Sequence, residues 1–358
     1  MPTQKNQHFV PQFYQRFFSS DNKTIASYLI KDNRIVTSPI KNTASKDYMY
    51  SINGKEEDGA DFEQILSLLE SRIAETFNYI VANPIQRLDG CHRFWILFSV
   101  LLQEGRTDLS AYNLQTALVE LESQLLAGQG VPHNKAELLL RELFSKPAPL
   151  SIDSTLANLS HCIDLELKVL VNNTSIAFIT SDNPVCRWNH WYEEREVDSL
   201  GWGSRGLVCF YPISPKIGVL LYDEVVYENG IPDTDYKELE DENDVMMLNM
   251  AVLYYADNIL LFNKETIQEN EIKKIVNQQE HLERQNRIVV DFFNYKGEDK
   301  LYVYERYAKG LGHLSFIRMK KEWQDCLLDP NTFYRYKQNP VEDWEIDALS
   351  YHIMKHNL

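Results

Sequence analysis

Apolar residues recur every three to four positions through the second quarter of the chain, which is the spacing of a helix with one buried face. Between Phe62 and Ile80 this spacing predicts an amphipathic helix that ends near Pro84. The stretch from Gly90 to Glu104 is apolar on nearly all sides, which is typical of a buried helix. Further helices are predicted over residues 110–126, 134–145 and 152–171. The middle of the chain is therefore predicted to be helical.

Short apolar runs on either side of this helical middle predict strands. Residues 24–30 and 34–36 flank a polar turn and predict a β-hairpin, and residues 175–180 are typical of a buried strand. Later elements are expected as strands at 207–211 and 216–222, a helix at 243–257, extended stretches at 259–262 and 301–304, and a charged helix at 265–284. The pattern predicts an α+β fold: an N-terminal β-hairpin, a helical middle, and a small mixed or antiparallel sheet in the second half.

The predicted elements follow one another without an internal repeat or a long linker. We therefore expect a single α+β domain over residues 1–358. Within it, residues 1–60 and 173–310 would form a β-containing part, and residues 61–172 a helical part.

The charge of the chain narrows the range of partners. With 52 acidic and 36 basic residues the net charge is −16, and an acidic surface repels nucleic-acid backbones at long range. A local basic groove would still accept the end of a nucleic acid. Neither an apolar run of about 18 residues nor the apolar stretch of a signal peptide is present, so we expect no membrane association and a cytoplasmic location. The five cysteines are scattered without a CxxC pair, which argues against a zinc site or a disulfide framework.

The N-terminal stretch from His8 to Phe18 combines five aromatic rings with three polar side chains that could act on a ligand, those of His8, Gln12 and Arg16. So many rings predict that the stretch docks into the body of the protein. Histidine changes charge near neutral pH, so His8 is a candidate general base or metal ligand. A histidine that only caps a nearby turn is the structural alternative, and it stays open.

Two further polar segments follow predicted core elements. Ser181, Asp182 and Asn183 come directly after the predicted strand at 175–180, where Asp182 could bind a metal or orient His8. An Asx turn closed by Pro184 explains the same residues. Gln103 and Arg106 follow the buried helix, and a guanidinium there could bind phosphate or carboxylate or serve as a structural ion-pair partner.

Weaker candidates come from spacing and from ring clusters. Glu63 and Glu70 lie seven residues apart on one helical face, which is more typical of a solvated surface, and we retain only Glu70. His190 is a candidate lid residue. Trp188, Trp191 and Trp202 could stack a base or a sugar, or form a hydrophobic plug. No phosphate-binding glycine loop, HExxH motif or EF-hand loop is present.

Three stretches together resemble a widespread, mainly bacterial family of unknown function. They are His8-Phe9-Val10-Pro11-Gln12-Phe13-Tyr14, residues 103–107, and Thr180 to Pro184 followed by Pro212-Ile213-Ser214-Pro215. The family opens with H-x-V-P-x-x-x-L-x-x-F, and the resemblance covers roughly the first 260 residues. It implies no activity. The positions it implies to be shared are His8, Pro11, Gln12, Arg16, Phe18, Arg106, Ser181, Asp182 and Pro184.

The chain departs from the family pattern at two positions. Gln15 stands where the family usually has leucine, which would alter the side facing the core. Asp108 stands where a proline often follows the Arg-Thr pair, which would change the local loop.

These residues favour a hydrolase that acts on a phosphate-containing substrate, as a nuclease or nucleotide hydrolase in bacterial antiviral defence or as a toxin effector. His8 would be the base or a ligand, Asp182 would orient it or hold a divalent metal, and Arg106 would bind the anionic substrate. Further contacts would come from Gln12, Arg16, Gln103, Ser181 and Asn183.

The alternative is a non-catalytic ligand-binding or sensor module in which the same residues form a structural polar network. A protein partner would also suit the acidic surface.

Overall fold

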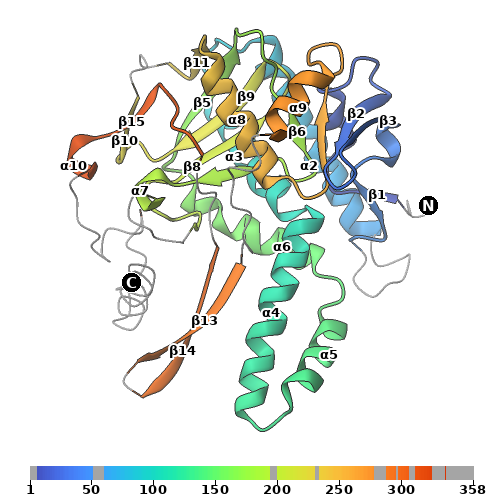
Figure 1. Ribbon diagram of the computed structural model, residues 1–358, viewed down its shortest axis with the longest axis vertical. Helices are drawn as coiled ribbons and strands as arrows, with labels where there is room; N and C mark the ends of the chain where they lie inside the picture. The colour runs from blue at the N-terminus through green and yellow to red at the C-terminus, as the bar shows by residue number, and fades with distance from the viewer. Residues whose placement is uncertain are drawn as a thin grey trace.

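The computed structural model describes residues 6–50, 60–193, 200–229, 234–277, 288–295, 297–305, 311–324 and 335. These residues form helices and several small antiparallel or mixed sheets (Figure 1), which confirms the predicted α+β class. No helix in the described part of the chain is long and apolar enough to cross a membrane. The expectation of one domain stays a prediction.

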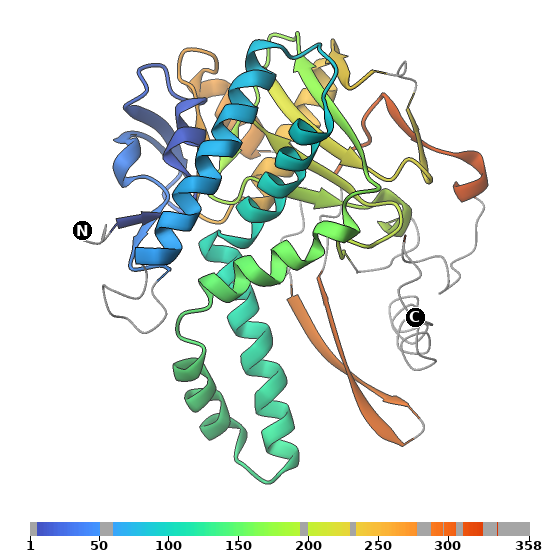
Figure 2. The ribbon, with the colours of Figure 1, turned by 180° about the vertical axis from the view of Figure 1, so that it is seen from behind.

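The largest sheet is buried on both faces. Its strands follow the order β11 (Tyr236–Leu239), β5 (Glu166–Asn172), β9 (Ile217–Tyr222), β8 (Val208–Pro212) and β7 (Cys186–Trp188). β11 runs parallel to β5, and the other neighbours are antiparallel. Figures 1 and 2 show α8 (Glu242–Tyr255) over one face, and α2 (Ala60–Ala82) and α3 (Gly90–Gly105) over the other. Both layers are needed because β8 and β9 are buried along their whole length.

A second sheet brings the N-terminus beside residues far along the chain. Its order is β3 (Arg34–Pro39), β2 (Thr24–Leu29), β12 (Ile259–Phe262) and β6 (Thr180–Ser181), with all neighbours antiparallel. The predicted hairpin at 24–36 is therefore confirmed. Because β12 lies between β2 and β6, the segment at Ser181 is held next to the N-terminal part of the chain.

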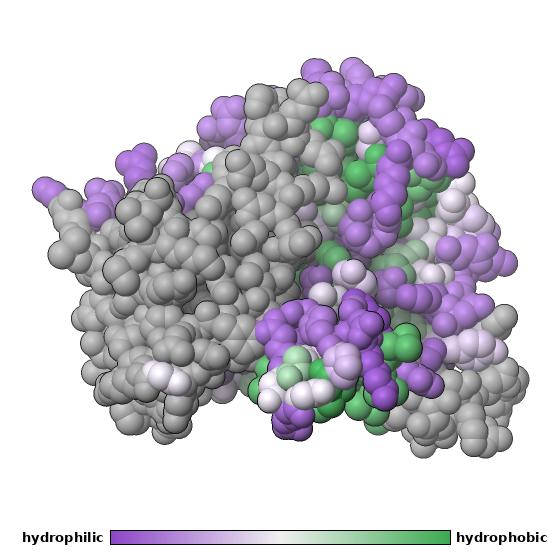
Figure 3. Space-filling view, turned by 60° about the horizontal axis from the view of Figure 1, so that its bottom comes forward, coloured by the Kyte–Doolittle hydropathy of each residue, from purple (hydrophilic) through white to green (hydrophobic). Residues whose placement is uncertain are grey.

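The predicted helices at 62–80, 90–104, 110–126 and 134–145 are confirmed as α2, α3, α4 (Asp108–Gly128) and α5 (His133–Leu143). Figure 1 shows α4 and α5 as an arm that extends away from the sheets. This arm has its own small apolar cluster of Val119, Ala136 and Leu140. Seen from the end of the arm, apolar and polar residues are mixed on its surface (Figure 3).

The prediction of a helix over residues 152–171 is wrong in its second half. α6 (Ala148–Leu156) ends early, the 3₁₀ turn η2 (Ala157–His161) follows, and β5 then occupies Glu166–Asn172. The residues of β5 are rich in Val and Leu, which also suit a strand. Their pairing with β9 on one side and β11 on the other overrides the helical spacing.

The buried strand predicted over 175–180 is strand only at its end, in β6. Ala177, Phe178 and Ile179 are buried without a ladder partner. Asn249 of α8 replaces the ladder: its side chain accepts a hydrogen bond from the Ile179 amide at 3.0 Å and donates one to the Ala177 carbonyl at 2.9 Å. The apolar run thus predicted burial correctly and the hydrogen-bonding pattern incorrectly.

The predicted strands at 207–211 and 216–222, the helix at 243–257 and the extended stretch at 259–262 are confirmed as β8, β9, α8 and β12. The helix predicted over 265–284 is shorter, because α9 spans Glu269–Asn277, and residues 278–287 lie outside the described residues. The extended stretch at 301–304 falls within β14 (Glu298–Glu305). The remaining elements are β1 (Asn6–His8), α1 (Gln12–Arg16), η1 (Ile40–Asn42), β4 (Ser45–Asp47), α7 (His190–Glu193), β10 (Tyr227–Asn229), β13 (Ile288–Tyr295), β14 (Glu298–Glu305), β15 (Ile317–Met319) and α10 (Lys321–Gln324).

Candidate functional site

Three of the residues predicted to form the site, His8, Gln12 and Arg106, line one small cavity of about 150 Å³. They come from β1, from the first turn of α1 and from the residue after α3. The N-terminal stretch and the segment after the buried helix therefore meet at this cavity. The remaining lining residues are Tyr50, Glu63, Leu66, Ser67 and Glu70.

Local structure explains why these side chains face the same space. β1 pairs with β4, and Pro11, which cannot donate a backbone hydrogen bond, directly precedes α1. The opposite wall is one face of α2, whose lining residues lie three, four and seven positions apart and therefore stack along one side of the helix. Glu63 and Glu70 thus reach the cavity through the seven-residue spacing that otherwise indicates a solvated surface.

Arg106 holds the cavity together. Its side chain is 3% exposed, and each of its three guanidinium nitrogens donates a hydrogen bond: Nε to the Tyr50 hydroxyl at 3.3 Å, one terminal nitrogen to Glu70 at 2.8 Å and the other to the His8 carbonyl at 2.7 Å. Burial acts to lower the pKa of Arg106, but Tyr50 and Glu70 outweigh it and raise the pKa above its ordinary value. Arg106 therefore stays charged and links α2, α3 and β1.

His8 is held as a neutral base. Its Nε2 atom lies 3.2 Å from the carbonyl oxygen of Ile40, which can only accept, so Nε2 carries the proton and Nδ1 the lone pair. Burial lowers the pKa of His8, and the positive charge of Arg106 lowers it further, against the opposing effects of the Ile40 carbonyl and Glu70. At neutral pH the ring is therefore uncharged.

The pKa of Glu63 is shifted in the opposite direction, upward. Its carboxylate accepts a hydrogen bond from the Gln7 amide at 3.3 Å. Burial raises the pKa of Glu63, and the negative charge of Glu70 adds to this, although Gln7 and Arg106 oppose it. The cavity therefore holds a base that loses its proton easily and an acid that keeps its proton to a higher pH than an exposed glutamate does.

Two other residues predicted for the site support the N-terminal stretch instead. The Gln103 amide donates a 3.0 Å hydrogen bond to the Phe9 carbonyl and is buried. Arg16 is exposed and donates to the Gln12 side chain at 3.3 Å. Gln103 thus fixes the backbone beside His8, and Arg16 contacts the rim residue Gln12.

Asp182 does not line this cavity. Its Oδ1 atom accepts a hydrogen bond from the Asp257 amide at 2.9 Å, and its Oδ2 atom accepts from the amides of Asn258 and Ile259 at 2.8 and 3.2 Å. The carboxylate therefore closes the turn between α8 and β12. Burial raises the pKa of Asp182 to about 6, although these three bonds oppose the shift.

The neighbours of Asp182 also have structural roles. Ser181 Oγ accepts a hydrogen bond from the Asn183 amide at 3.1 Å, and the Asn183 side chain donates to the Tyr255 carbonyl at 3.0 Å. The segment is therefore a structural turn, as in the alternative explanation, but it is closed by the Ser181 hydroxyl and not by an Asx side chain. His8 and Asp182 are not in contact, so Asp182 does not orient the ring. The described residues contain no cluster of three or more His, Cys, Asp or Glu side chains that could hold a metal.

Tyr14 connects the two parts that His8 and Asp182 do not connect. Its hydroxyl donates to the Pro212 carbonyl at 2.5 Å and lies 2.6 Å from the Thr180 hydroxyl. Because the single proton of Tyr14 is used on Pro212, Thr180 donates to Tyr14. The segments at 180–184 and 212–215 thus meet the N-terminal stretch through a fully buried tyrosine.

Residues 6–266 match the family model described as "Protein of unknown function (DUF4238)". The match covers more than half of the chain. The chain belongs to the DUF4238 family. Searches of the curated proteins and of the solved structures found no match.

The family segment of this DUF4238 protein includes every residue that lines the His8 cavity. Two lining residues, Glu63 and Tyr50, are not among the site residues that the sequence predicts. Glu63 could have been found from its seven-residue spacing to Glu70, whereas Tyr50 carries no motif and reaches the cavity only because β4 pairs with β1.

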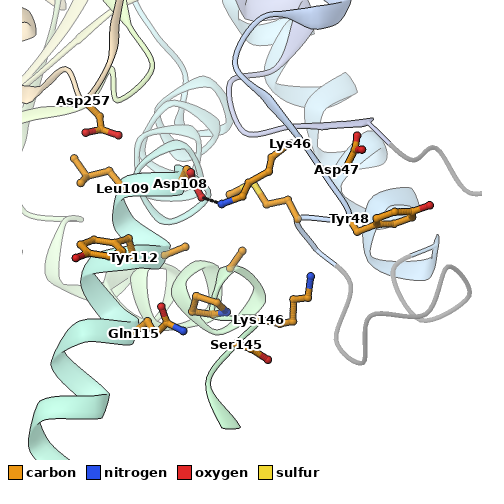
Figure 4. A pocket seen from close by; sticks show the side chains of 14 residues that line it. Lys46, Asp47, Tyr48, Asp108, Leu109, Tyr112, Gln115, Ser145, Lys146 and Asp257 are labelled. Atoms are coloured by element: carbon orange, nitrogen blue, oxygen red, sulfur yellow. Dashed lines mark hydrogen bonds and ion pairs between the residues drawn. The ribbon is translucent and has the colours of Figure 1, made fainter. Parts of the chain in front are cut away.

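A larger cavity of about 400 Å³ lies where residues 46–49 face the start of α4. Figure 4 shows the ring of Tyr48 on one side and that of Tyr112 on the other, with Lys46 and Asp108 joined by an ion pair of 2.7 Å. Asp108, which stands where the DUF4238 resemblance leads us to expect proline, thus closes the loop through Lys46. Both side chains are largely exposed, so this pair contributes little stability.

The three tryptophans and His190 are all buried in the DUF4238 chain, and Trp202 also lines a cavity. Trp188 and Trp191 are buried, as expected of a hydrophobic plug. His190 is also buried, with Nδ1 3.2 Å from Glu193. Trp202 lines a third cavity.

Proposed function

We propose that the chain is a hydrolase that cleaves a phosphodiester at the His8 cavity, in a bacterial defence or toxin role. The observation that carries this proposal is the presence of His8, Glu63 and Arg106 around one cavity. Burial shifts the pKa of His8 down and that of Glu63 up. Opposite shifts of a base and an acid in one cavity are typical of acid–base catalysis.

Hydrolysis needs both groups. His8, neutral at pH 7, accepts the proton of the attacking water at Nδ1, and the protonated fraction of Glu63 donates a proton to the leaving oxygen. This pair restores both protonation states through exchange with water after each turnover. In this scheme Asp182 has no part in the reaction.

The charge around the cavity favours a phosphodiester over a phosphate monoester. Arg106 has five N–H groups, three of which are used within the protein, so two remain for a substrate oxygen. Glu70 already neutralises the charge of Arg106, however. A phosphodiester brings a single negative charge, whereas a phosphate monoester brings nearly two. The volume of about 150 Å³ is below the roughly 300–1,000 Å³ of drug-sized pockets. Only the reacting group would enter it.

The test is the rate of cleavage of bis(p-nitrophenyl) phosphate and of a single-stranded oligonucleotide by the wild type and by His8→Gln. Glutamine keeps a donor for the Ile40 carbonyl but cannot accept a proton as a base. We expect kcat/KM to fall by about 10²–10⁴-fold. His133→Gln, an exposed histidine in the first turn of α5, is the matched control and should leave the rate unchanged. Full activity in a folded His8→Gln variant would refute the proposal.

The pH dependence supplies a second test. The base works only when His8 is unprotonated, and its pKa lies below the ordinary value of 6.5. Activity should therefore be retained down to below pH 6.5 and be lost as the pH falls through the pKa of His8. Glu63→Gln removes the proton donor and should lower kcat without moving this acid limb. If the acid limb stays at the same pH in His8→Gln, it reports the titration of another group.

A non-catalytic binding or sensor module is the second candidate, favoured because each Arg106 nitrogen already donates one hydrogen bond within the protein, as in a structural polar network. It predicts that a phosphodiester binds the wild type without being cleaved. It also predicts that His8→Gln weakens this binding. Calorimetric titration with dimethyl phosphate, followed by analysis of the recovered ligand, separates binding from turnover.

A further inference from the structure

The third cavity, of about 270 Å³, lies among α4, α6 and the segment Leu200–Trp202. It shares no lining residue with the His8 cavity. The two are built on residues that lie two positions apart, however: Arg106 lines the His8 cavity and Glu104 lines this one. Because residues two apart on a helix point in different directions, the end of α3 supplies a charged side chain to each.

Among the described residues that line this cavity, the charged ones are Glu104 and Arg187, and they form an ion pair. Their side chains are 15% and 6% exposed and lie 2.7 Å apart. Trp202 fixes both: its indole nitrogen donates to Glu104 at 2.6 Å, and its ring centroid lies 4.8 Å from the Arg187 guanidinium carbon. The charges of Glu104 and Arg187 therefore compensate each other, and polar and apolar groups both line the wall.

Neutral hydrogen-bonding groups make up most of the remaining wall. The Asn113 amide and the Ser154 hydroxyl form no hydrogen bonds with other described residues; Asn113 is half-buried, and Ser154 is exposed. Leu114 and Leu200 add an apolar part next to the Trp202 ring. The other polar lining residues are Ser110, Ser151, Thr155 and Asn158.

We propose that this cavity binds a single neutral sugar ring, either a free monosaccharide or the ribose of a nucleoside. Each sugar hydroxyl both donates and accepts, and the amide of Asn113 and the hydroxyl of Ser154 offer both functions in return. Glu104 disfavours an anion and Arg187 disfavours a cation, whereas a neutral polyol can bond to both without disturbing their pair. The apolar wall contacts the C–H groups of the ring.

The size of the cavity suits a small ligand such as one sugar ring. Its volume of about 270 Å³ lies just below the roughly 300–1,000 Å³ typical of drug-sized ligands. An oligosaccharide would extend outside it. The inference does not depend on the proposed hydrolase activity, because the two cavities share no lining residue.

Isothermal titration calorimetry on the full chain tests the proposal with four probes: glucose, ribose, adenosine and glucose 6-phosphate. We expect at least one neutral probe to bind, and glucose 6-phosphate to bind more weakly than glucose. Binding of glucose alone identifies a free monosaccharide as the source, whereas binding of ribose and adenosine identifies a nucleoside. Tighter binding of glucose 6-phosphate than of every neutral probe, or no binding of any neutral probe, would overturn the proposal.

Two variants locate the binding. Asn113→Leu replaces the amide by an apolar group of similar size, and we expect it to raise the Kd of the bound sugar at least fivefold. Ser154→Ala should raise it about twofold. The matched controls are Thr116→Val, on the same helix outside the cavity, and Ser160→Ala, an exposed serine just beyond α6. If both cavity variants bind as tightly as their controls, the sugar binds elsewhere and the assignment is wrong.

Discussion

Burial and hydrogen bonding act on Asp182 in opposite directions. Three backbone amides donate to its carboxylate, which favours the charged form, yet burial dominates and raises its pKa to about 6. The unfolded chain should titrate at the ordinary value of 3.8. The folded state therefore binds the proton more tightly than the unfolded state between these two values.

This difference makes the stability of the protein depend on pH. Because the folded state holds more protons, the Asp182 contribution is most favourable below about pH 4 and is lost as the pH rises to about 6. Raising the pKa from 3.8 to about 6 corresponds to on the order of 3 kcal/mol. Asp182→Asn does not titrate, so urea unfolding from pH 4 to 7 should show a smaller decline in its unfolding free energy than in that of the wild type. Parallel curves for the two proteins would contradict the raised pKa.

The packing of α3 against α6 depends on a glycine at the end of α3. A Cβ atom built on Gly105 would lie 2.9 Å from the Cα atom of Ile152 and 2.9 Å from the carbonyl oxygen of Ser151. Both are backbone atoms, so neither can move without displacing α6. This close approach places Glu104 and Arg106 next to their cavities.

Gly105→Ala should therefore separate α3 from α6. We expect a loss of about 1–3 kcal/mol in unfolding free energy, the usual cost of overpacking, measured by urea denaturation. Gly90→Ala, at the start of the same helix, is the matched control because nothing lies within 4 Å of its added Cβ atom. This control should leave the unfolding free energy unchanged or raise it slightly. Equal stabilities for the two variants would show that α6 adjusts without cost.

Among the described residues, the buried apolar side chains form two separate clusters. The large one extends from Val10 to Ile317, and the small one consists of Val119, Ala136 and Leu140 in the arm of α4 and α5. The arm also carries exposed leucines, among them Leu138 at 72%. We infer that the arm opens independently of the sheets, because few apolar contacts hold it.

Leu140→Ala tests this independence by hydrogen–deuterium exchange. Removing a buried leucine from a cluster of this size should cost about 2 kcal/mol locally and speed exchange in α4 and α5. Strands β8 and β9 should exchange as in the wild type. Leu138→Ala, on the same helix but exposed, should change neither region. If β8 and β9 also exchange faster in Leu140→Ala than in the wild type, the two clusters unfold together.

Local patterns were enough to predict the α+β class, the N-terminal hairpin and the helices α2 to α5. Periodicity reports which face of a segment is buried, and that information is local. It failed at residues 166–172 because pairing with two distant strands decided between helix and strand. It also failed at 177–179, where Asn249 took the place of a strand partner.

The candidate site shows the same division. Residue chemistry alone identified His8, Gln12 and Arg106, because few other side chains can act as a base or bind an anion. Their common cavity, and the separation of Asp182 from it, depend on contacts between segments up to 98 residues apart, such as that of Arg106 with the His8 carbonyl. The hydrogen bonds that buried polar groups form determine where such side chains lie. A carboxylate that accepts hydrogen bonds from three backbone amides stabilises the fold. Nothing in the sequence around Asp182 indicates those three partners.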